Sequence, residues 1–133
     1  MIEADTFSMV LHVTYCSKKK SREPGKLPAI ERYNSERIEE LHEQARQNKE
    51  DFAILSGEHG LVTPTEEVTY YDRLLREEDL EEMIPVVRED LQGREVSKVV
   101  YHTREIESER VPYFRLIRES CRREKIDFSY LII

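Results

Sequence analysis

Residues 52–61 read Phe52-Ala53-Ile54-Leu55-Ser56-Gly57-Glu58-His59-Gly60-Leu61, and they give the strongest indication of the fold. The stretch begins as an apolar run of the kind found in buried strands and breaks abruptly into small, polar and glycine residues. Two of the four glycines of the chain lie in this break. In open α/β folds the ligand site lies where a strand ends and the chain turns away from the sheet. The stretch therefore predicts a buried strand followed directly by a candidate binding loop.

Runs of apolar and β-branched residues predict four strands in all, and apolar residues at helical spacing predict three helices between them. The strands are expected at about 9–15, 52–55, 98–102 and 128–133, and the helices at about 35–48, 77–91 and 108–125. Residues 16–33 and 56–73 are expected to be loops. The order β-α-β-α-β-α-β predicts a four-stranded, mostly parallel sheet with helices on its faces. We therefore expect a single three-layer α/β domain over residues 1–133, in which an antiparallel edge strand remains open.

Individual residues predict where the helices begin and end. Ser35 and Ser108 can cap the first and third helix, because a serine oxygen accepts from the free N–H groups of a first turn. Pro85 should bend the second helix or delay its start. Gly93 is a natural stop for that helix.

The composition excludes several classes of protein. No run approaches the ~18 apolar residues that a membrane span requires, and the first residues lack the pattern of a signal peptide. We therefore expect a cytoplasmic protein without a membrane partner. Two cysteines do not make a disulfide framework. Cys121 lies among apolar helix positions and is expected to be a small buried hydrophobe.

Positive charge gathers in one segment of an acidic chain. The formal net charge is −7, yet residues 17–37 hold seven Lys or Arg against three Glu. Such a chain is poorly suited to bind nucleic acid over an extended surface, but it can present a local site for an anion. In Cys16-Ser17-Lys18-Lys19-Lys20 the lysines supply point charges and Ser17 a hydroxyl for phosphate or carboxylate oxygens. The glycines of a P-loop are missing, so a solvated basic loop is the alternative. Nearby lysines also favour the thiolate of Cys16, a candidate nucleophile.

Three polar loops follow the expected parallel strands, at residues 16–20, 56–61 and 102–104. The carboxyl ends of parallel strands meet at one edge of a sheet. We therefore expect these three loops to converge on a single crevice.

Ser56 in the second loop could be a nucleophile with His59 or His102 as its base. The G-x-S-x-G elbow is missing, however, and no acidic residue is placed to orient either imidazole. We favour a role in which Ser56 and the backbone of Gly57 and Gly60 position a ligand or stabilise a tight turn. No Cys, His or Asp set has metal-ligand spacing, so we expect no metal and no cofactor.

Tyr70-Tyr71-Asp72 lies in an expected loop, where exposed aromatic residues often bind ligands. Tyr71 can stack on a base or ring, and Asp72 can accept hydrogen bonds from its edge. The alternative is that Tyr71 fills the core beneath this connection and Asp72 caps a following helix. The sequence leaves both interpretations open.

Two blocks of the sequence resemble a known family. Cys16-Ser17-Lys18-Lys19 after an N-terminal strand, and Leu55-Ser56-x-x-x-Gly60-Leu61-x-x-Pro64 followed by Tyr71-Asp72, are similar to blocks in short relatives of the YaaA peroxide-stress family. A similar Cys-Ser-x-Lys loop occurs in the core domain of archaeosine synthase, which acts on a 7-deazaguanine base in transfer RNA. The resemblance covers about residues 10–75. It implies a site made of Cys16, Ser17, Lys18, Ser56, Gly60, Tyr71 and Asp72.

These observations together predict a crevice that binds a nucleotide, a modified purine base or an end of tRNA or DNA. Cys16 and Lys18 are the candidate catalytic residues, and binding is assigned to Ser17, Lys19, Ser56, Gly60, Tyr71 and Asp72. The resemblance implies a nucleobase group-transfer or lyase reaction. Two alternatives stay open. One is a non-catalytic module that binds nucleotides or nucleic acid, and the other is a structural protein that forms a homodimer through residues 129–133.

Overall fold

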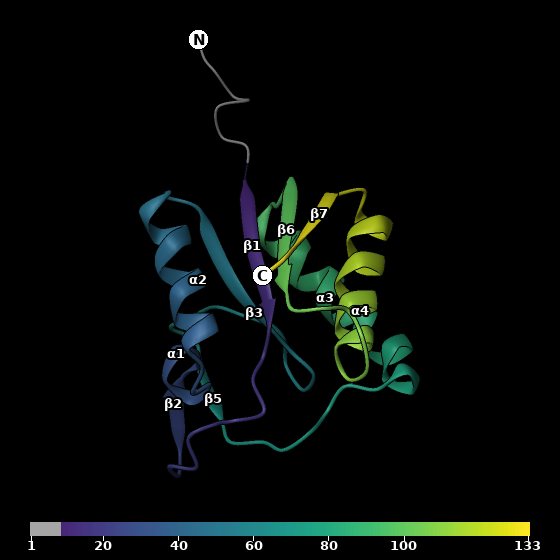
Figure 1. The fold of residues 1–133 in the computed structure, drawn as a ribbon. Helices are drawn as coiled ribbons and strands as arrows, with labels where there is room; N and C mark the ends of the chain where they lie inside the picture. The colour runs from purple at the N-terminus through teal and green to yellow at the C-terminus, as the bar shows by residue number, and fades with distance from the viewer. Residues whose placement is uncertain (1–8) are drawn as a thin grey trace.

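The computed structural model describes residues 9–133, and a five-stranded sheet forms its centre (Figure 1). The strands lie in the order β4-β3-β1-β6-β7, with the bounds Gly60–Val62, Asp51–Ser56, Val10–Tyr15, Lys98–Thr103 and Asp127–Ile132. Neighbouring strands are parallel except β3 and β4, which form an antiparallel hairpin. The predicted α/β class and mostly parallel sheet are confirmed. The predicted count of four strands is wrong, because β4 adds a fifth.

The fifth strand belongs to the segment 56–73 that we expected to be a loop. The chain turns after β3 and returns as β4, with Ser56 opposite Gly60. The Ser56 hydroxyl oxygen accepts from the backbone N–H groups of Glu58 at 3.1 Å and His59 at 3.0 Å. Gly60 has a φ of +79°, which suits glycine in such a turn. A strand of three residues is too short to give a periodic signal, which explains why the pattern did not predict it.

Three long helices cover the two faces of the sheet, so the described chain has three layers. They span Glu36–Gln47 (α2), Leu80–Arg94 (α3) and Arg110–Glu124 (α4). Helix α2 packs on one face against β3, whereas α3 and α4 pack together on the other face (Figure 1). Each helix turns an apolar row toward the sheet, such as Ile38, Leu41 and Ala45 of α2. Within residues 9–133 no helix is long and apolar enough to cross a membrane.

The starts of α2 and α3 follow the sequence signals. The Ser35 side chain caps α2 as predicted, and its oxygen accepts from the N–H of Ile38 at 3.3 Å. Helix α3 begins at Leu80 after a short 3₁₀ turn, slightly later than expected, and contains Pro85.

Two other boundary predictions are wrong. Gly93 does not end α3, because the helix continues to Arg94 and stops where Glu95 takes a left-handed φ of 52°. Ser108 does not cap α4, because it also has a φ of 52°, whereas a capping serine needs extended backbone. Glu109 occupies the cap position of α4 instead.

A small second sheet organises the segment 16–33, which we expected to be a loop throughout. Strands β2 (Lys26–Pro28) and β5 (Glu67–Thr69) pair antiparallel, and the short helix α1 (Ala29–Arg32) follows β2. The side chain of Arg32 is fully buried. Its guanidinium donates to the backbone carbonyls of Ser21 at 2.6 Å, Glu23 at 3.0 Å, Gly25 at 2.7 Å and Val68 at 3.2 Å. One side chain therefore ties the loop after β1 to the small sheet.

Candidate functional site

A cleft of about 680 Å³ opens at the sheet edge where β1 ends. Four parts of the chain line it, which are residues 15–20, the segment before and at the start of α2 (Asn34, Ser35 and Arg37), residues 72–74, and the start of α4 (Glu109, Arg110 and Tyr113). Its volume lies within the roughly 300–1,000 Å³ that small-molecule sites occupy. The cleft also lies at the carboxyl edge of parallel strands, where α/β folds bind their ligands.

Cationic side chains dominate the lining of the cleft. Two carboxylates line the cleft, those of Asp72 and Glu109. Six cationic side chains line it with them, namely Lys18, Lys19, Lys20, Arg37, Arg73 and Arg110. The excess of positive charge contrasts with the formal net charge of −7 of the whole chain. A cavity that concentrates one sign of charge favours a ligand of the opposite sign.

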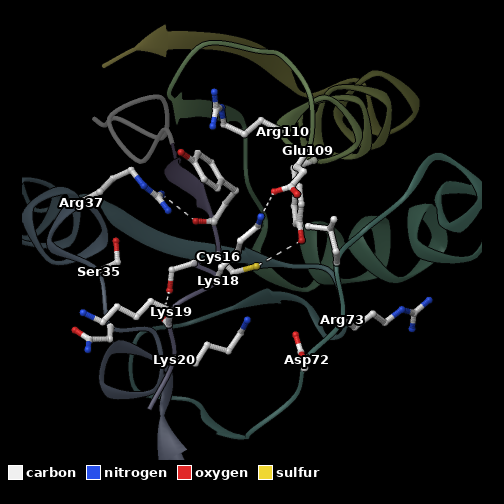
Figure 2. Close-up of a pocket in the computed structure, with 15 residues that line it drawn as sticks. Cys16, Lys18, Lys19, Lys20, Ser35, Arg37, Asp72, Arg73, Glu109 and Arg110 are labelled. Carbon is white, nitrogen blue, oxygen red and sulfur yellow. Dashed lines mark hydrogen bonds and ion pairs between the residues drawn. The ribbon is translucent and has the colours of Figure 1, made fainter. Parts of the chain in front are cut away.

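Lys18, Arg73 and Arg110 are held by carboxylates or a backbone carbonyl, and Arg37 is held by Thr14 and Tyr15. Lys18 forms an ion pair with Glu109 across the cleft (Figure 2). Arg73 points away from the centre and pairs with Glu58 at 3.2 Å and Asp79 at 3.1 Å. Arg110 donates to the carbonyl of Glu105 at 2.6 Å.

Lys19, Lys20 and Asp72 have no ion-pair partner in the described part of the chain. The ammonium of Lys20 lies 4.7 Å from the centre of the Tyr71 ring, which forms a cation–π contact and leaves its charge available. Figure 2 shows the side chains of Lys20 and Asp72 turned toward the middle of the cleft. No helix starts directly after Asp72, so it does not act as the helix cap that the sequence left open.

Arg37 and Tyr15 form one wall of the cleft. The guanidinium of Arg37 stacks 3.7 Å above the Tyr15 ring and donates to the Tyr15 carbonyl at 2.9 Å and to the Thr14 hydroxyl. Burial lowers the pKa of Arg37 from its ordinary value. An arginine starts from so high a pKa that the group stays charged at neutral pH. Sequence reasoning missed Arg37, although its place in the first turn of α2 sets it near the sheet edge.

Cys16 lies at the floor of the cleft with 8% of its surface exposed. Its thiol donates to the Tyr113 hydroxyl over 3.8 Å, and that hydroxyl oxygen accepts from the backbone N–H of Leu75 at 3.2 Å. Burial, and then the charge of a Cys16 thiolate, raise the pKa of Tyr113. Cys121 is fully buried as predicted, and burial raises its pKa to about 12.

The structure brings five of the eight predicted site residues to the cleft, namely Cys16, Ser17, Lys18, Lys19 and Asp72. Ser17 shapes the loop, since its hydroxyl donates to the carbonyl of Lys19 at 2.7 Å. The other three, Ser56, Gly60 and Tyr71, do not line the cleft.

Those three residues instead support the loops from within. Tyr71 is nearly buried, and its hydroxyl accepts from Ser56 at 2.8 Å and lies 2.6 Å from the Tyr33 hydroxyl. Of the two interpretations of Tyr71, the structure places it in the core. Burial raises the pKa of Tyr71, so its hydroxyl stays protonated. Gly60 packs against Val86 and Asp90 of α3.

The histidines lie apart from the cleft. His59 packs edge-on against Tyr71 at 5.1 Å between ring centres. His12 Nδ1 lies 2.9 Å from His102 Nε2, and His12 Nε2 lies 2.6 Å from a Glu50 oxygen. Burial and the neighbouring His12 lower the pKa of His102. Among residues 9–133 no three His, Cys, Asp or Glu side chains gather as a metal site.

Comparison with known proteins identifies the family of the chain. Residues 11–108 match the model described as Family of unknown function (DUF6884). No curated protein and no solved structure gave a match. The family match connects the chain neither to the YaaA family nor to archaeosine synthase. Because the matched segment covers most of the sequence and carries β1, β3 and the loop 16–20, the chain belongs to the DUF6884 family.

Proposed function

We propose that the cleft binds the phosphate groups of a nucleotide or of a nucleic-acid end. The observation that carries this proposal is the charge of the lining, six cationic side chains against two carboxylates in an acidic protein. Lys19 and Lys20 have no ion-pair partner within residues 9–133, so an anion can use their charge without breaking an existing ion pair. Lys18 can join them if its pair with Glu109 opens.

The start of α2 adds neutral donors to this cationic wall. Asn34, Ser35 and Arg37 line the cleft, so the first turn of α2 lies beside it. The first N–H groups of a helix have no partner inside the helix and favour an anion. Backbone donors and lysine charges therefore supply complementary halves of a phosphate site. The resemblance to archaeosine synthase, which acts on a base in transfer RNA, agrees with this class of ligand.

Asp72 and the buried residues have distinct parts in this proposal. Asp72 carries a carboxylate without a protein partner in the described chain and can accept from a ribose hydroxyl or a ring N–H. Ser56, Gly60 and Tyr71 act behind the lining, because they hold the β3–β4 turn and the ring beneath Lys20.

Replacing Lys20 by glutamine should weaken binding of pyrophosphate and of nucleoside monophosphates at least tenfold, about 1.4 kcal/mol. The loss is expected because a charge-assisted hydrogen bond becomes a neutral one. Isothermal titration at low salt measures it, and wild-type affinity should fall as salt rises. Lys26→Gln is the matched control, since Lys26 is exposed on β2 outside the cleft. Equal losses in both variants, or no binding of any of these probes, would contradict the proposal.

A second candidate function is catalytic, with Cys16 as nucleophile in a group transfer on a nucleobase. The supporting observation is the place of its sulfur, at the floor of the cleft below Lys18 and next to the Tyr113 hydroxyl (Figure 2). A thiol is the most nucleophilic side chain available there. Lys18 and Tyr113 are the groups that can assist it.

Iodoacetamide should label Cys16 and leave Cys121 unmodified in the folded protein. Cys121 is fully buried and its pKa is raised to about 12, so that its reactive thiolate is scarce. A nucleotide bound in the cleft should slow the labelling of Cys16, as measured by peptide mass spectrometry. The variant Cys16→Ser should lose the label but keep nucleotide affinity. Labelling of Cys16 that is indifferent to bound nucleotide counts against a sulfur facing the ligand.

A further inference from the structure

A second cavity lies on the other side of Arg37 from the cleft. Its volume is about 470 Å³, and Arg37 lines both cavities. Helix α2 forms one wall, and the ends of β6 and β7 form the other. Helix α2 packs against this face of the sheet at β3. At the other end of the sheet, the edge strand β7 has large apolar side chains that stay exposed.

Apolar and polar side chains both line the second cavity. Leu131 and Ile133 are 53% and 48% exposed although both are aliphatic. Around them lie Glu40 and Gln44 of α2 and Arg104 after β6, whose side chains have no hydrogen-bond partner within residues 9–133. Accessible apolar surface beside uncommitted hydrogen-bonding groups can receive a ring-bearing small molecule.

His102 adds a hydrogen-bond acceptor to the lining of the second cavity. A Glu50 carboxyl oxygen accepts from His12 Nε2–H, so that His12 Nδ1 is left to accept from His102 Nε2–H. This assignment follows from the hydrogen-bond network and leaves His102 Nδ1 as an acceptor without a partner in the described chain. Burial lowers the pKa of His102, which keeps the ring neutral near pH 7.

The two cavities complement each other chemically. The cleft offers cations for phosphate but little free aromatic surface, because Arg37 covers the Tyr15 ring and Tyr71 is in the core. The second cavity offers aliphatic side chains together with donors and acceptors, and its two arginines are balanced by two glutamates, Glu36 and Glu40. That balance suits an uncharged ring better than a second phosphate.

We infer that the second cavity binds the nucleobase of the nucleotide whose phosphate lies in the cleft, with the sugar crossing Arg37. The inference rests on the proposed function. The base packs on Leu131 and Ile133, while Gln44, Glu40 and His102 pair with the hydrogen-bonding groups at its edge. The phosphate and the base are thus recognised by opposite sides of one arginine.

Titrations with three probes test this inference, namely pyrophosphate, ribose 5-phosphate and the four nucleoside 5′-monophosphates. At least one nucleotide should bind tenfold or more tightly than ribose 5-phosphate, which lacks a base. Leu131→Asp should abolish that difference and leave the ribose 5-phosphate affinity within twofold of wild type. The matched control is Ile132→Asp, which adds the same charge. Ile132 has a similar exposed fraction, 52%, and does not line the cavity. This control variant should retain the preference for the nucleotide.

A second variant protects the test against a folding defect. Gln44→Ala on the exposed surface of α2 should reduce nucleotide affinity and leave ribose 5-phosphate affinity unchanged. Equal affinity for nucleotides and ribose 5-phosphate in the wild type overturns the inference and leaves the proposed function intact. Equal effects of the two aspartate variants also overturn it. If none of the probes binds, pyrophosphate included, the proposed function fails first.

Discussion

Replacing Arg32 by methionine should destabilise the protein by about 3 kcal/mol, because four backbone carbonyls lose their donor. Methionine fills a similar volume with apolar atoms, and a buried carbonyl left without a partner costs about 1–3 kcal/mol. Carbonyls near the surface can recover part of this free energy from water. Urea denaturation monitored by circular dichroism measures the free energy of unfolding.

Two comparison variants separate the hydrogen bonds of Arg32 from general effects of charge. Arg32→Lys should recover less than half of the loss, because an ammonium cannot spread donors over carbonyls in several directions. Arg22→Met, at an exposed position of the same loop, should change the free energy of unfolding by less than about 0.5 kcal/mol. If Arg32→Met leaves the free energy of unfolding unchanged, the loop 21–25 holds its shape without this side chain. The position of Lys20 in the cleft would then also be independent of Arg32.

Replacing Gly60 by alanine should also destabilise the protein by about 3 kcal/mol. A Cβ atom at this position would lie 2.7 Å from Asp90 Oδ2 and 2.9 Å from Val86 Cγ1, so that these two side chains of α3 must shift. The φ of +79° adds the strain of a left-handed residue, about 1–2 kcal/mol. Movement of Asp90 would further weaken the hydrogen bond that it accepts from Leu61 N–H at 3.0 Å. Chemical denaturation of the purified variant measures the loss.

Two other glycines provide the controls for Gly60. Gly25 has a φ of +83°, but a methyl group added there would meet no atom within 4 Å, so Gly25→Ala should cost only about 1–2 kcal/mol of strain. Gly93 lies inside α3 with open space around it, so Gly93→Ala should stabilise the protein by about 0.5–1 kcal/mol. If Gly60→Ala costs no more than Gly25→Ala, the close approach of α3 to the hairpin does not constrain this position.

The long elements of the fold could be predicted because their signals are local. Phe52 to Leu55 are buried in β3, and an apolar run of that kind is visible without knowledge of its neighbours. The three-residue strands β2, β4 and β5 could not be predicted in this way, because three residues give no periodic signal and β2 pairs with β5 from a distant part of the chain. Of the two predicted helix caps, the one at Ser35 is confirmed and the one at Ser108 is wrong. Ser35 has the extended backbone that a capping serine needs, whereas Ser108 has a left-handed φ of 52°.

The candidate site could be predicted only where it follows a strand. Cys16 to Lys19 come directly after β1, so the topology alone brings them to the sheet edge. Arg37 and Tyr113 reach the cleft from helices, and the packing of each helix decides which of its side chains arrive there. Tyr71 was ambiguous because a loop tyrosine can bind or pack. The hydroxyls of Ser56 and Tyr33, which decide the matter, are remote in sequence.

Helix α2 contributes side chains to both cavities, so its length sets the distance between them. Ser35 at its cap lines the cleft, and Gln44 lines the second cavity. Nine helical steps of about 1.5 Å separate them, which is a span of about 13.5 Å along the axis. In the proposed binding mode, a free base or a free phosphate is shorter than this span and reaches only one of the two cavities. The length of α2 would then favour ligands that are long enough to reach both.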